Sequence, residues 1–543
     1  MSRSVFFDAF TEFGQREGKP LPVRWRLEEL LAEMEHCSIS GALTASTQSV
    51  SYDLMSGNLE LSAKLQPHPH LFPIWNVMPH QTGECPEPRQ LETLMRQHNV
   101  RAVTIYPKTN AWDWNASHSQ VLLRWLERRQ ILTILKRGEF AHFSELDRFL
   151  QRHRQLPVLL VGATWGDQRF LLPLVQQYRN LHIMFDWFQV NYGIEDLVAG
   201  GQANQLVFGS TAPAMAIGPH RTYVDYADVP ASVRAKIAGG NLTRLLHGLK
   251  PPGERVNKNE DRLMAAVRAG KTIPVPVIDM HMHILHEGLN GAGGHFRMSH
   301  GGPKDTFKRL KQLGCVGGGF MSWNGPVSCD SLAGNRTVAA ALDAAPPGYF
   351  GLATFDPVYF TQDELRKVIP ALYQDKRFIG MKPYPTFGLC YDDPRYDVWW
   401  AHGNKLGLYA GLHRNRLDFS EVDHLAKKYP RVRWVPYHCG MRYDVADAAI
   451  ECIRKHRNVF AEITYTSVPS GVLEHLVNNA GADRVVYGSD LPMRDPRQQL
   501  GWVVFSRLTP AEKEQVLWRN ALKVIGPCLK RLPEYNRPIV PTK

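Results

Sequence analysis

The chain repeats itself once, and this repeat constrains its fold more than any single motif. Phe143–Asp147 matches Phe419–Asp423 at an offset of 276 residues, and Val207–Ser210 matches Val486–Ser489 at an offset of 279. Along the whole chain the offset changes only from 271 to 279, whereas chance similarities would not stay collinear. The pattern indicates a tandem duplication, and 543 residues are enough for two domains of about 250 residues each.

A segment rich in helix-breaking residues, Lys250–Glu254, lies between the two copies. Two prolines and a glycine within five residues are typical of a linker. The apolar spacing from 259 to 269 then predicts a helix that ends at Gly270. We therefore expect a first domain at residues 1–249, a linker and helix at 250–274, and a second domain at 275–543.

Each copy alternates short apolar runs with longer amphipathic segments. In the second copy the apolar runs predict eight strands, at 275–280, 316–321, 350–354, 378–381, 408–412, 432–437, 459–463 and 485–487. Eight strand–helix units in about 250 residues are typical of a (β/α)8 barrel, with a doubly wound sheet as the second choice. We expect an α/β protein with two tandem (β/α)8 TIM-like barrels, and functional residues at the carboxyl ends of their strands.

Four predicted strands of the second copy finish in residues that bind metals. His281 and His283 close the first strand and face the same side of it, because they are two residues apart. His413, His438 and Asp490 follow the fifth, sixth and eighth predicted strands. Imidazoles combined with a carboxylate suit Zn²⁺ best, and Mn²⁺ less selectively. The sequence predicts one divalent metal ion at the mouth of the second barrel.

Motifs around these residues resemble the amidohydrolase superfamily. The segments that carry the likeness are Asp279–His283, Gly380–Pro385, His438–Gly440 and Tyr487–Pro492. They are most similar to the amidohydrolase-related branch, which includes metal-dependent hydrolases and decarboxylases such as aminocarboxymuconate-semialdehyde decarboxylase. The resemblance covers about 275–527. It implies that His281, His283, His413 and Asp490 bind the metal, and that His438 lies near the metal-bound water or the substrate.

The residue types fit more than one reaction. A divalent ion activates water and polarises a carbonyl, while Asp490 and His438 can accept or pass on protons as catalytic residues. We expect a hydrolase that acts on an amide, ester or lactone of a carboxylate-bearing small molecule. A metal-dependent non-oxidative decarboxylase at the same site is one alternative, and a metal-holding binding or scaffold protein without turnover is another. The complete set of five residues favours an enzyme.

Four further residues of the second copy are candidates for substrate binding. They are Lys382, Arg414, Trp323 and Arg494, and each follows a predicted strand or its loop. For Lys382 two other roles stay open: a structural ion pair, since lysines are seldom buried without a partner, or carbamylation to bridge a second metal.

The first copy lacks the metal ligands. The offsets place Phe10, Glu12, Lys136, Gly162 and Thr211 opposite His281, His283, His413, His438 and Asp490. Only Glu12 among the replacements is a usual metal ligand, so we predict a barrel without metal and without this chemistry. Such a copy can form an internal pseudo-dimer with the second barrel, or it can keep a ligand pocket and regulate the second. A higher oligomer is compatible with either role.

Composition excludes several other classes of protein. The 64 Lys and Arg exceed the 52 Asp and Glu, for a formal charge of +12, which mildly favours an anionic substrate. No nucleic-acid-binding motif accompanies this charge, so we expect no nucleic-acid partner. We also expect no membrane partner, because the sequence shows neither a span-length apolar run nor a signal peptide. Eight cysteines without a disulfide or zinc pattern fit a cytoplasmic protein.

Overall fold

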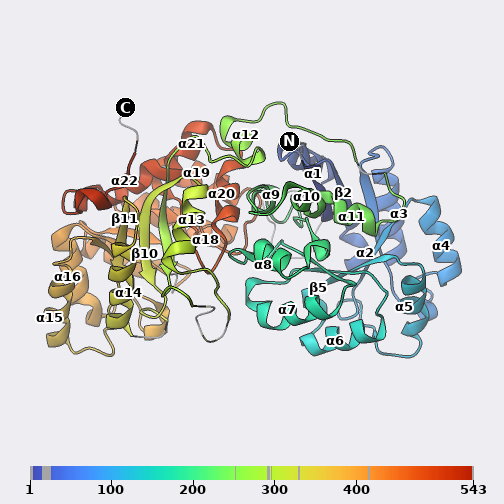
Figure 1. Cartoon of the computed structure of the whole chain (residues 1–543), viewed down its shortest axis with the longest axis horizontal. Helices are drawn as coiled ribbons and strands as arrows, with labels where there is room; N and C mark the ends of the chain where they lie inside the picture. Colours follow the sequence, from blue (N-terminus) through green and yellow to red (C-terminus); the bar gives the residue numbers. More distant parts are fainter. Residues whose placement is uncertain are drawn as a thin grey trace. The chain divides into compact units, whose positions relative to one another are not determined.

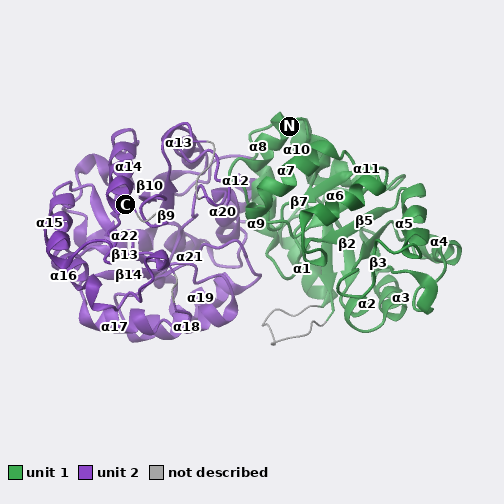
Figure 2. Cartoon of the chain, turned by 90° about the horizontal axis from the view of Figure 1, so that it is seen from below, with its two compact units in different colours: residues 1–260 green, residues 261–543 purple. Residues whose placement is uncertain are grey.

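A computed structural model describes residues 4–14, 26–250, 252–289, 294, 296–327, 330–413 and 416–540. The chain consists of two compact units, residues 1–260 and residues 261–543 (Figure 2). The boundary between these units falls within the segment 250–274, where the sequence predicts a linker and a helix.

The first unit contains one sheet of eight parallel strands that pair in chain order. Figure 1 labels β2 and β5 of this sheet and the helices of the unit. The strands are β1 (Phe7–Phe13), β2 (Gly41–Ser46), β3 (Leu71–Asn76), β4 (Ala102–Ile105), β5 (Leu132–Lys136), β6 (Val158–Val161), β7 (Leu181–Met184) and β8 (Leu206–Val207). The backbone N–H of Ala9 in β1 donates to the carbonyl of Phe208, just after β8, at 3.0 Å. The last strand therefore returns to the first, and the sheet closes into the predicted barrel.

Helices follow the strands of the first unit in alternation. They are α1 (Leu27–His36), α2 (Gln48–Ser51), α3 (Leu54–Leu65), α4 (Pro88–Gln97), α5 (Ser119–Arg128), α6 (Phe143–Arg152), α7 (Gln168–Gln177), α8 (Gly193–Ala199), α9 (Ile217–Asp225), α10 (Ala231–Ala235) and α11 (Asn241–Leu245). In α6 the apolar residues Phe143, Leu146, Phe149 and Leu150 are buried. Their spacing of three to four residues gives the helix one apolar face.

The second unit has the same order of strands, in a sheet of six and a pair. The strands are β9 (Val277–Ile284), β10 (Cys315–Ser322), β11 (Tyr349–Ala353), β12 (Phe378–Met381), β13 (Tyr409–Leu412), β14 (Arg433–Pro436), β15 (Ala461–Glu462) and β16 (Val485–Val486). Parallel bridges join Trp434 in β14 to Val459, and Met282 in β9 to Leu491. The pair β15–β16 thus fills the gap between β14 and β9, which confirms the prediction of two barrels.

The helices of the second unit also alternate with its strands. They are α12 (Arg262–Arg268), α13 (Pro303–Gln312), α14 (Ser331–Asp343), α15 (Gln362–Leu372), α16 (Asp397–Leu406), α17 (Ser420–Lys428), α18 (Tyr443–Lys455), α19 (Val472–Ala480), α20 (Pro496–Val504), α21 (Pro510–Glu514) and α22 (Asn520–Ile525). The predicted helix at 259–269 is α12, which begins after Asp261, whose side chain accepts hydrogen bonds from the N–H groups of Leu263 and Met264.

The first strand of the second copy extends beyond its apolar run. The apolar run covers 275–280, whereas β9 spans Val277–Ile284. His281 and His283 therefore lie within the strand, at the end where the sequence places them, and both are buried. The strand continues past the apolar run because the two histidines face the inside of the barrel.

Fine details of the backbone also repeat at a constant offset. The π-helical segments Lys236–Gly240 and Gln515–Arg519 are 279 residues apart. After the first segment, Asn241 Nδ2 donates to the carbonyls of Ala203 and Leu206. Asn520 Nδ2 donates to the carbonyls of Ala482 and Val485, each 279 residues further along. The two units thus end their barrels in the same way.

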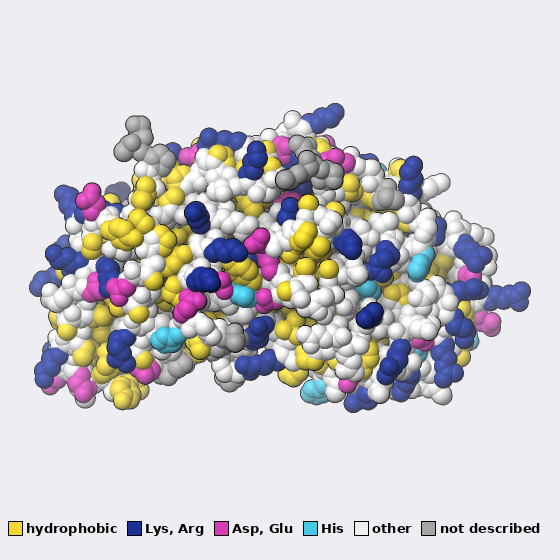
Figure 3. All heavy atoms as spheres, in the orientation of Figure 1, with side chains coloured by type: hydrophobic (Ala, Val, Ile, Leu, Met, Phe, Trp, Pro, Cys, Tyr) yellow, Lys and Arg dark blue, Asp and Glu magenta, His cyan; other side chains and the backbone are white. Residues whose placement is uncertain are grey.

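On the face of the molecule drawn in Figure 3, the positive charges do not gather into one patch. On the face drawn in Figure 3, Lys and Arg side chains are scattered among acidic, apolar and uncharged ones. Within the described residues, no helix has both the length and the apolar character needed to cross a lipid bilayer.

Candidate metal centre

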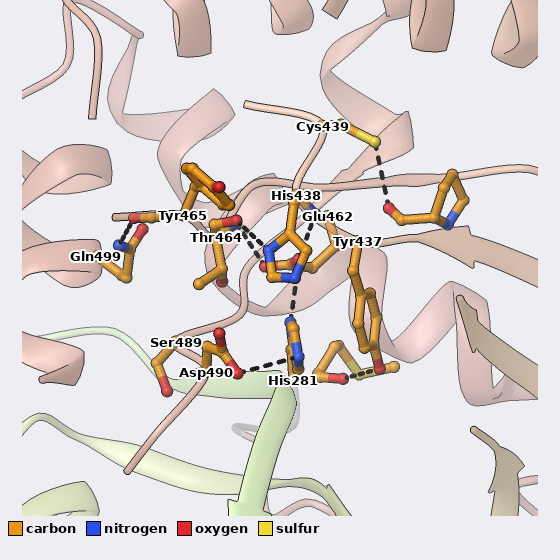
Figure 4. Close-up of polar contacts among 12 residues, drawn as sticks. His281, Tyr437, His438, Cys439, Glu462, Thr464, Tyr465, Ser489, Asp490 and Gln499 are labelled. Carbon is orange, nitrogen blue, oxygen red and sulfur yellow. Dashed lines mark hydrogen bonds and ion pairs between the residues drawn. The ribbon is translucent and has the colours of Figure 1, made fainter. Parts of the chain in front are cut away.

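The five predicted metal-site residues meet at the carboxyl ends of the strands in the second unit. His281 and His283 lie in β9, while His413, His438 and Asp490 lie in the segments after β13, β14 and β16. All except the half-buried His413 are no more than 2% exposed. In Figure 4, His281 lies between His438 on one side and Asp490 on the other.

Short distances join these side chains into one cluster. Asp490 Oδ1 is 3.0 Å from His283 Nε2 and 3.3 Å from His281 Nε2. His281, His438 and Asp490 each offer a ligand atom, and these atoms lie within 4.8 Å of one another. The ring of His413 is 4.8 Å from the ring of His438, centroid to centroid. His438 thus offers a ligand atom to the same cluster as His281 and Asp490, two of the four residues that the sequence proposes as ligands.

Unusual backbone conformations direct two of these side chains. His438 has φ 68° and Asp490 has φ 58°, both in the left-handed region that residues other than glycine seldom adopt. The N–H of Asp490 donates to the carbonyl of His281 at 2.7 Å, which ties the turn after β16 to β9. Such strained positions persist only where the surrounding structure holds them, as at binding sites.

The buried imidazoles are in the form that binds metals. Burial lowers the pKa of His281, His283 and His438 well below the usual value, and neighbouring cations and imidazoles lower it further. They are therefore neutral at pH 7, with a lone pair free for a ligand. His438 Nδ1 lies 2.6 Å from the carbonyl of Thr464, so that Nδ1 carries the proton and Nε2 is left as the acceptor.

Glu462, at the end of β15, is a site residue that the sequence analysis missed. It is fully buried, and its Oε2 lies 3.3 Å from His281 Nδ1 and accepts the N–H of His438 at 3.1 Å. Burial raises the pKa of Glu462 to about 6. A carboxylate behind a histidine orients the ring of a metal ligand. The available signal was a charged residue within the otherwise apolar run 459–463.

Lys382, directly after β12, is fully buried in the same region. Its Nζ lies 4.0 Å from the centroid of the Tyr437 ring and 5.5 Å from that of Tyr384. In the described part of the chain, Nζ has no hydrogen-bond partner, and burial lowers the pKa of Lys382 well below its usual value. Among those residues it therefore does not form the structural ion pair that was one of its predicted roles.

The other predicted substrate-binding residues have different positions. Arg494 Nη1 pairs with Asp490 Oδ2, and its Nε donates to Thr466 Oγ1 at 2.7 Å. Trp323 is buried with its ring edge-on to His283, 4.6 Å between centroids. Arg414 lies outside the described residues.

The donor set fits a divalent cation. It combines neutral imidazoles with one carboxylate, which is the mixture that Zn²⁺ and other first-row divalent ions bind. His283 Nδ1 is also buried without a hydrogen-bond partner among the described residues, an uncommon state for a buried nitrogen.

One family model matches a segment of the second unit. Residues 278–526 match the family described as Amidohydrolase. The match covers 249 of the 543 residues, all of them within the second unit. No curated protein matches the chain.

Solved structures similar to the chain each correspond to about half of it. The 5-carboxyvanillate decarboxylase of Sphingomonas paucimobilis is 12% identical with a TM-score of 0.35, and the match covers 45% of this chain and 98% of that one. Amidohydrolase 2 of Bifidobacterium longum subsp. infantis is 15% identical with a TM-score of 0.35, and the match covers 46% of this chain and 99% of that one. The dihydroxybenzoic acid decarboxylase of Polaromonas sp. JS666 was solved with manganese and 2-nitroresorcinol. It is 17% identical with a TM-score of 0.35, and the match covers 46% of this chain and 97% of that one.

Proposed function

We propose that the second unit, residues 261–543, is a metal-dependent decarboxylase of small aromatic carboxylic acids. The state of Asp490 carries this proposal: Oδ2 pairs with Arg494, while Oδ1 lies against the imidazoles of His281 and His283. A carboxylate beside a guanidinium is a weaker proton acceptor than a free carboxylate. Asp490 is therefore better suited to hold a metal than to take a proton from water, and decarboxylation requires no such base.

The rest of the site fits a flat acid. Lys382 is a buried nitrogen without a partner among the described residues, and a substrate carboxylate would supply one. The rings of Trp323 and Tyr384 are 6.4 Å apart, centroid to centroid, and roughly perpendicular to each other. Aromatic walls of this kind bind a planar body by stacking and edge contacts.

His281, His283, His413 and Asp490 would hold one divalent ion, Zn²⁺ or Mn²⁺. When bound, the ion supplies positive charge that polarises substrate oxygens and lowers the cost of charge developing on the substrate. His438 donates Nδ1–H to the Thr464 carbonyl and exchanges a proton through Nε2. The bond between the ring carbon and the carboxylate carbon breaks, CO₂ leaves, and the ring carbon keeps the electron pair. The ring carbon then takes a proton that His438 Nε2 has first accepted from water, which is left as hydroxide.

Hydrolysis, which the sequence analysis placed first, becomes the second candidate. One observation favours it: Asp490 Oδ1 faces the histidines rather than Arg494, and this oxygen can still accept a proton from water. The two reactions share the metal site and differ in whether water is consumed.

A direct test compares the two reactions on one acid. The full chain, loaded with Zn²⁺ or Mn²⁺, is given 5-carboxyvanillate or 2,6-dihydroxybenzoate, and CO₂ is measured with a coupled assay. The methyl ester of each acid is tested in parallel for release of methanol. We expect CO₂ from at least one acid and its loss in Asp490→Asn and His281→Ala. Ester hydrolysis without CO₂ from either acid would overturn the proposal in favour of a hydrolase.

A further inference from the structure

A cavity lies in the first unit, at the carboxyl ends of the barrel strands, as the metal centre does in the second unit. Its volume is about 430 Å³, and its lining comes from the segments after β2, β3 and β4, including Val50, Met78 and Trp112. Binding sites of (β/α)8 barrels lie on this face, and ligand pockets commonly measure about 300–1,000 Å³. The cavity is therefore where a ligand of this barrel would bind, although the barrel has lost the metal ligands.

The charge of this cavity is opposite to that of the chain. Glu84 and Asp113 line it, and neither Lys nor Arg does, whereas the whole chain carries a formal charge of +12. Glu84 accepts a hydrogen bond from Thr82 Oγ1 at 2.6 Å, and Asp113 accepts one from the N–H of Asn115 at 2.8 Å. Neither carboxylate forms an ion pair within the described ranges, so both negative charges are available to a ligand.

Aromatic and rigid polar groups complete the lining. The rings of Trp112 and Tyr52 both line the cavity, and Tyr52 is 88% exposed. Asn110 is fixed from two sides: its Oδ1 accepts from Asn76 Nδ2 at 3.0 Å, and its Nδ2 donates to the carbonyl of Val50 at 3.0 Å. The wall beside the two rings is thus formed before any ligand arrives.

We propose that the first unit binds a small organic ammonium ion in this cavity. Indole and phenol rings attract a cation to their faces, and two nearby carboxylates add charge complementarity. The cavity has room for an ammonium group attached to one aromatic or aliphatic body. The first barrel thus serves as a ligand-binding domain, and this role does not depend on the reaction proposed for the second unit.

Benzylammonium chloride is a suitable probe, with benzyl alcohol and benzoate as its neutral and anionic counterparts. Each compound is titrated into the full chain by calorimetry. We expect benzylammonium to bind about tenfold more tightly than benzyl alcohol, and benzoate not to bind. The double variant Glu84→Gln/Asp113→Asn should lose this preference, while Glu35→Gln, which removes another exposed carboxylate of the first unit, should keep it.

Three outcomes would overturn the proposal: no binding of benzylammonium, equal binding of the three compounds, or unchanged binding in the double variant. Glu84 and Asp113 are exposed, so replacing them leaves the core of the unit intact. Repeating the titration with Asp490→Asn separates this proposal from the previous one. That variant should bind benzylammonium normally even if it, or the wild type, shows no turnover.

Discussion

The two barrels share a backbone frame but differ in what fills their mouths. Asp8 in the first unit accepts the N–H groups of Phe10 and Ser210, and Asp279 in the second accepts those of His281 and Ser489. The left-handed positions also correspond, with Thr211 (φ 59°) opposite Asp490 and Gly162 (φ 82°) opposite His438. The duplicated frame has therefore outlasted the metal-binding residues in the first copy.

Where the second unit has histidines, the first unit has an ion pair. Lys136 and Glu12, which stand opposite His413 and His283, are joined by a short contact between Nζ and Oε1. Lys136 Nζ also lies 4.8 Å from the ring of Phe10, which stands opposite His281. The comparison teaches that a cation from the chain itself occupies the histidine positions of the first mouth. In the second mouth, where Arg494 pairs with Asp490, the proposed function assigns the histidines to a metal ion.

The largest expected effect comes from changing the aspartate position. Asp490→Asn should remove the bound metal and lower activity roughly a thousandfold, because the ion contributes several kcal/mol to catalysis. Elemental mass spectrometry of wild type and variant, alongside the activity assay, measures both effects. In the wild-type protein, we expect about one metal ion per chain.

Thr211→Asn is the matched control for that change, since Thr211 has the same backbone conformation in the first unit. It should leave metal content and activity at the wild-type level. A loss of metal in this control would mean that the first barrel takes part in metal binding, which would remove the contrast between the two mouths.

The ion pair of the first unit should contribute to stability rather than to catalysis. Lys136→Met leaves the buried Glu12 carboxylate without its cation, which should cost roughly 2–3 kcal/mol, less than for a fully buried pair because Lys136 is 29% exposed. Urea unfolding measures this loss, and the double variant Glu12→Gln/Lys136→Met should recover most of it. A midpoint unchanged in the single variant, or a lowered metal content, would contradict this interpretation.

Much of this contrast is predictable from the sequence, because the repeat and the strand–helix alternation determine which residues reach each mouth. Parallel strands bring their carboxyl ends to one edge, so residues as distant as His281 and Asp490 are expected to meet. The same logic assigns Glu12 and Lys136 to one mouth. Their contact, across 124 residues, depends on side-chain lengths that the pattern does not report.

Other parts of the site depend on local structure without a sequence pattern. Arg494 is a predicted substrate-binding residue, and the turn after β16 also brings it onto Asp490, four residues earlier, a contact that the sequence pattern does not report. Glu462 belongs to a strand of only two residues, so its inward direction follows from the closed barrel rather than from any alternation. Short strands and turns are where sequence periodicity stops being informative.

Glu462 provides a sharper comparison, because Asp186 stands opposite it at an offset of 276 and likewise accepts a backbone N–H, that of Gly162, at 3.2 Å. Glu462→Gln should weaken metal affinity by about 10–100-fold, since the partner that orients His281 is lost. Asp186→Asn should not change it. Metal titration with a competing chelator gives the affinity, and equal effects of the two variants would point to a general role in folding.

The smallest expected effect comes from replacing Lys382. The replacement should raise the stability of the chain but weaken substrate binding. Lys382→Met keeps the volume but removes a buried nitrogen that has no partner within the described residues, so the unfolding free energy should rise by about 0.5–2 kcal/mol. The substrate should meanwhile bind less tightly, with a higher KM. Thr104, its counterpart in the first unit, already donates to the carbonyl of Trp75 at 3.5 Å, so Thr104→Val should bring no such gain. If Lys382→Met instead destabilised the chain, the lysine would be part of the framework, and the substrate carboxylate would need another partner.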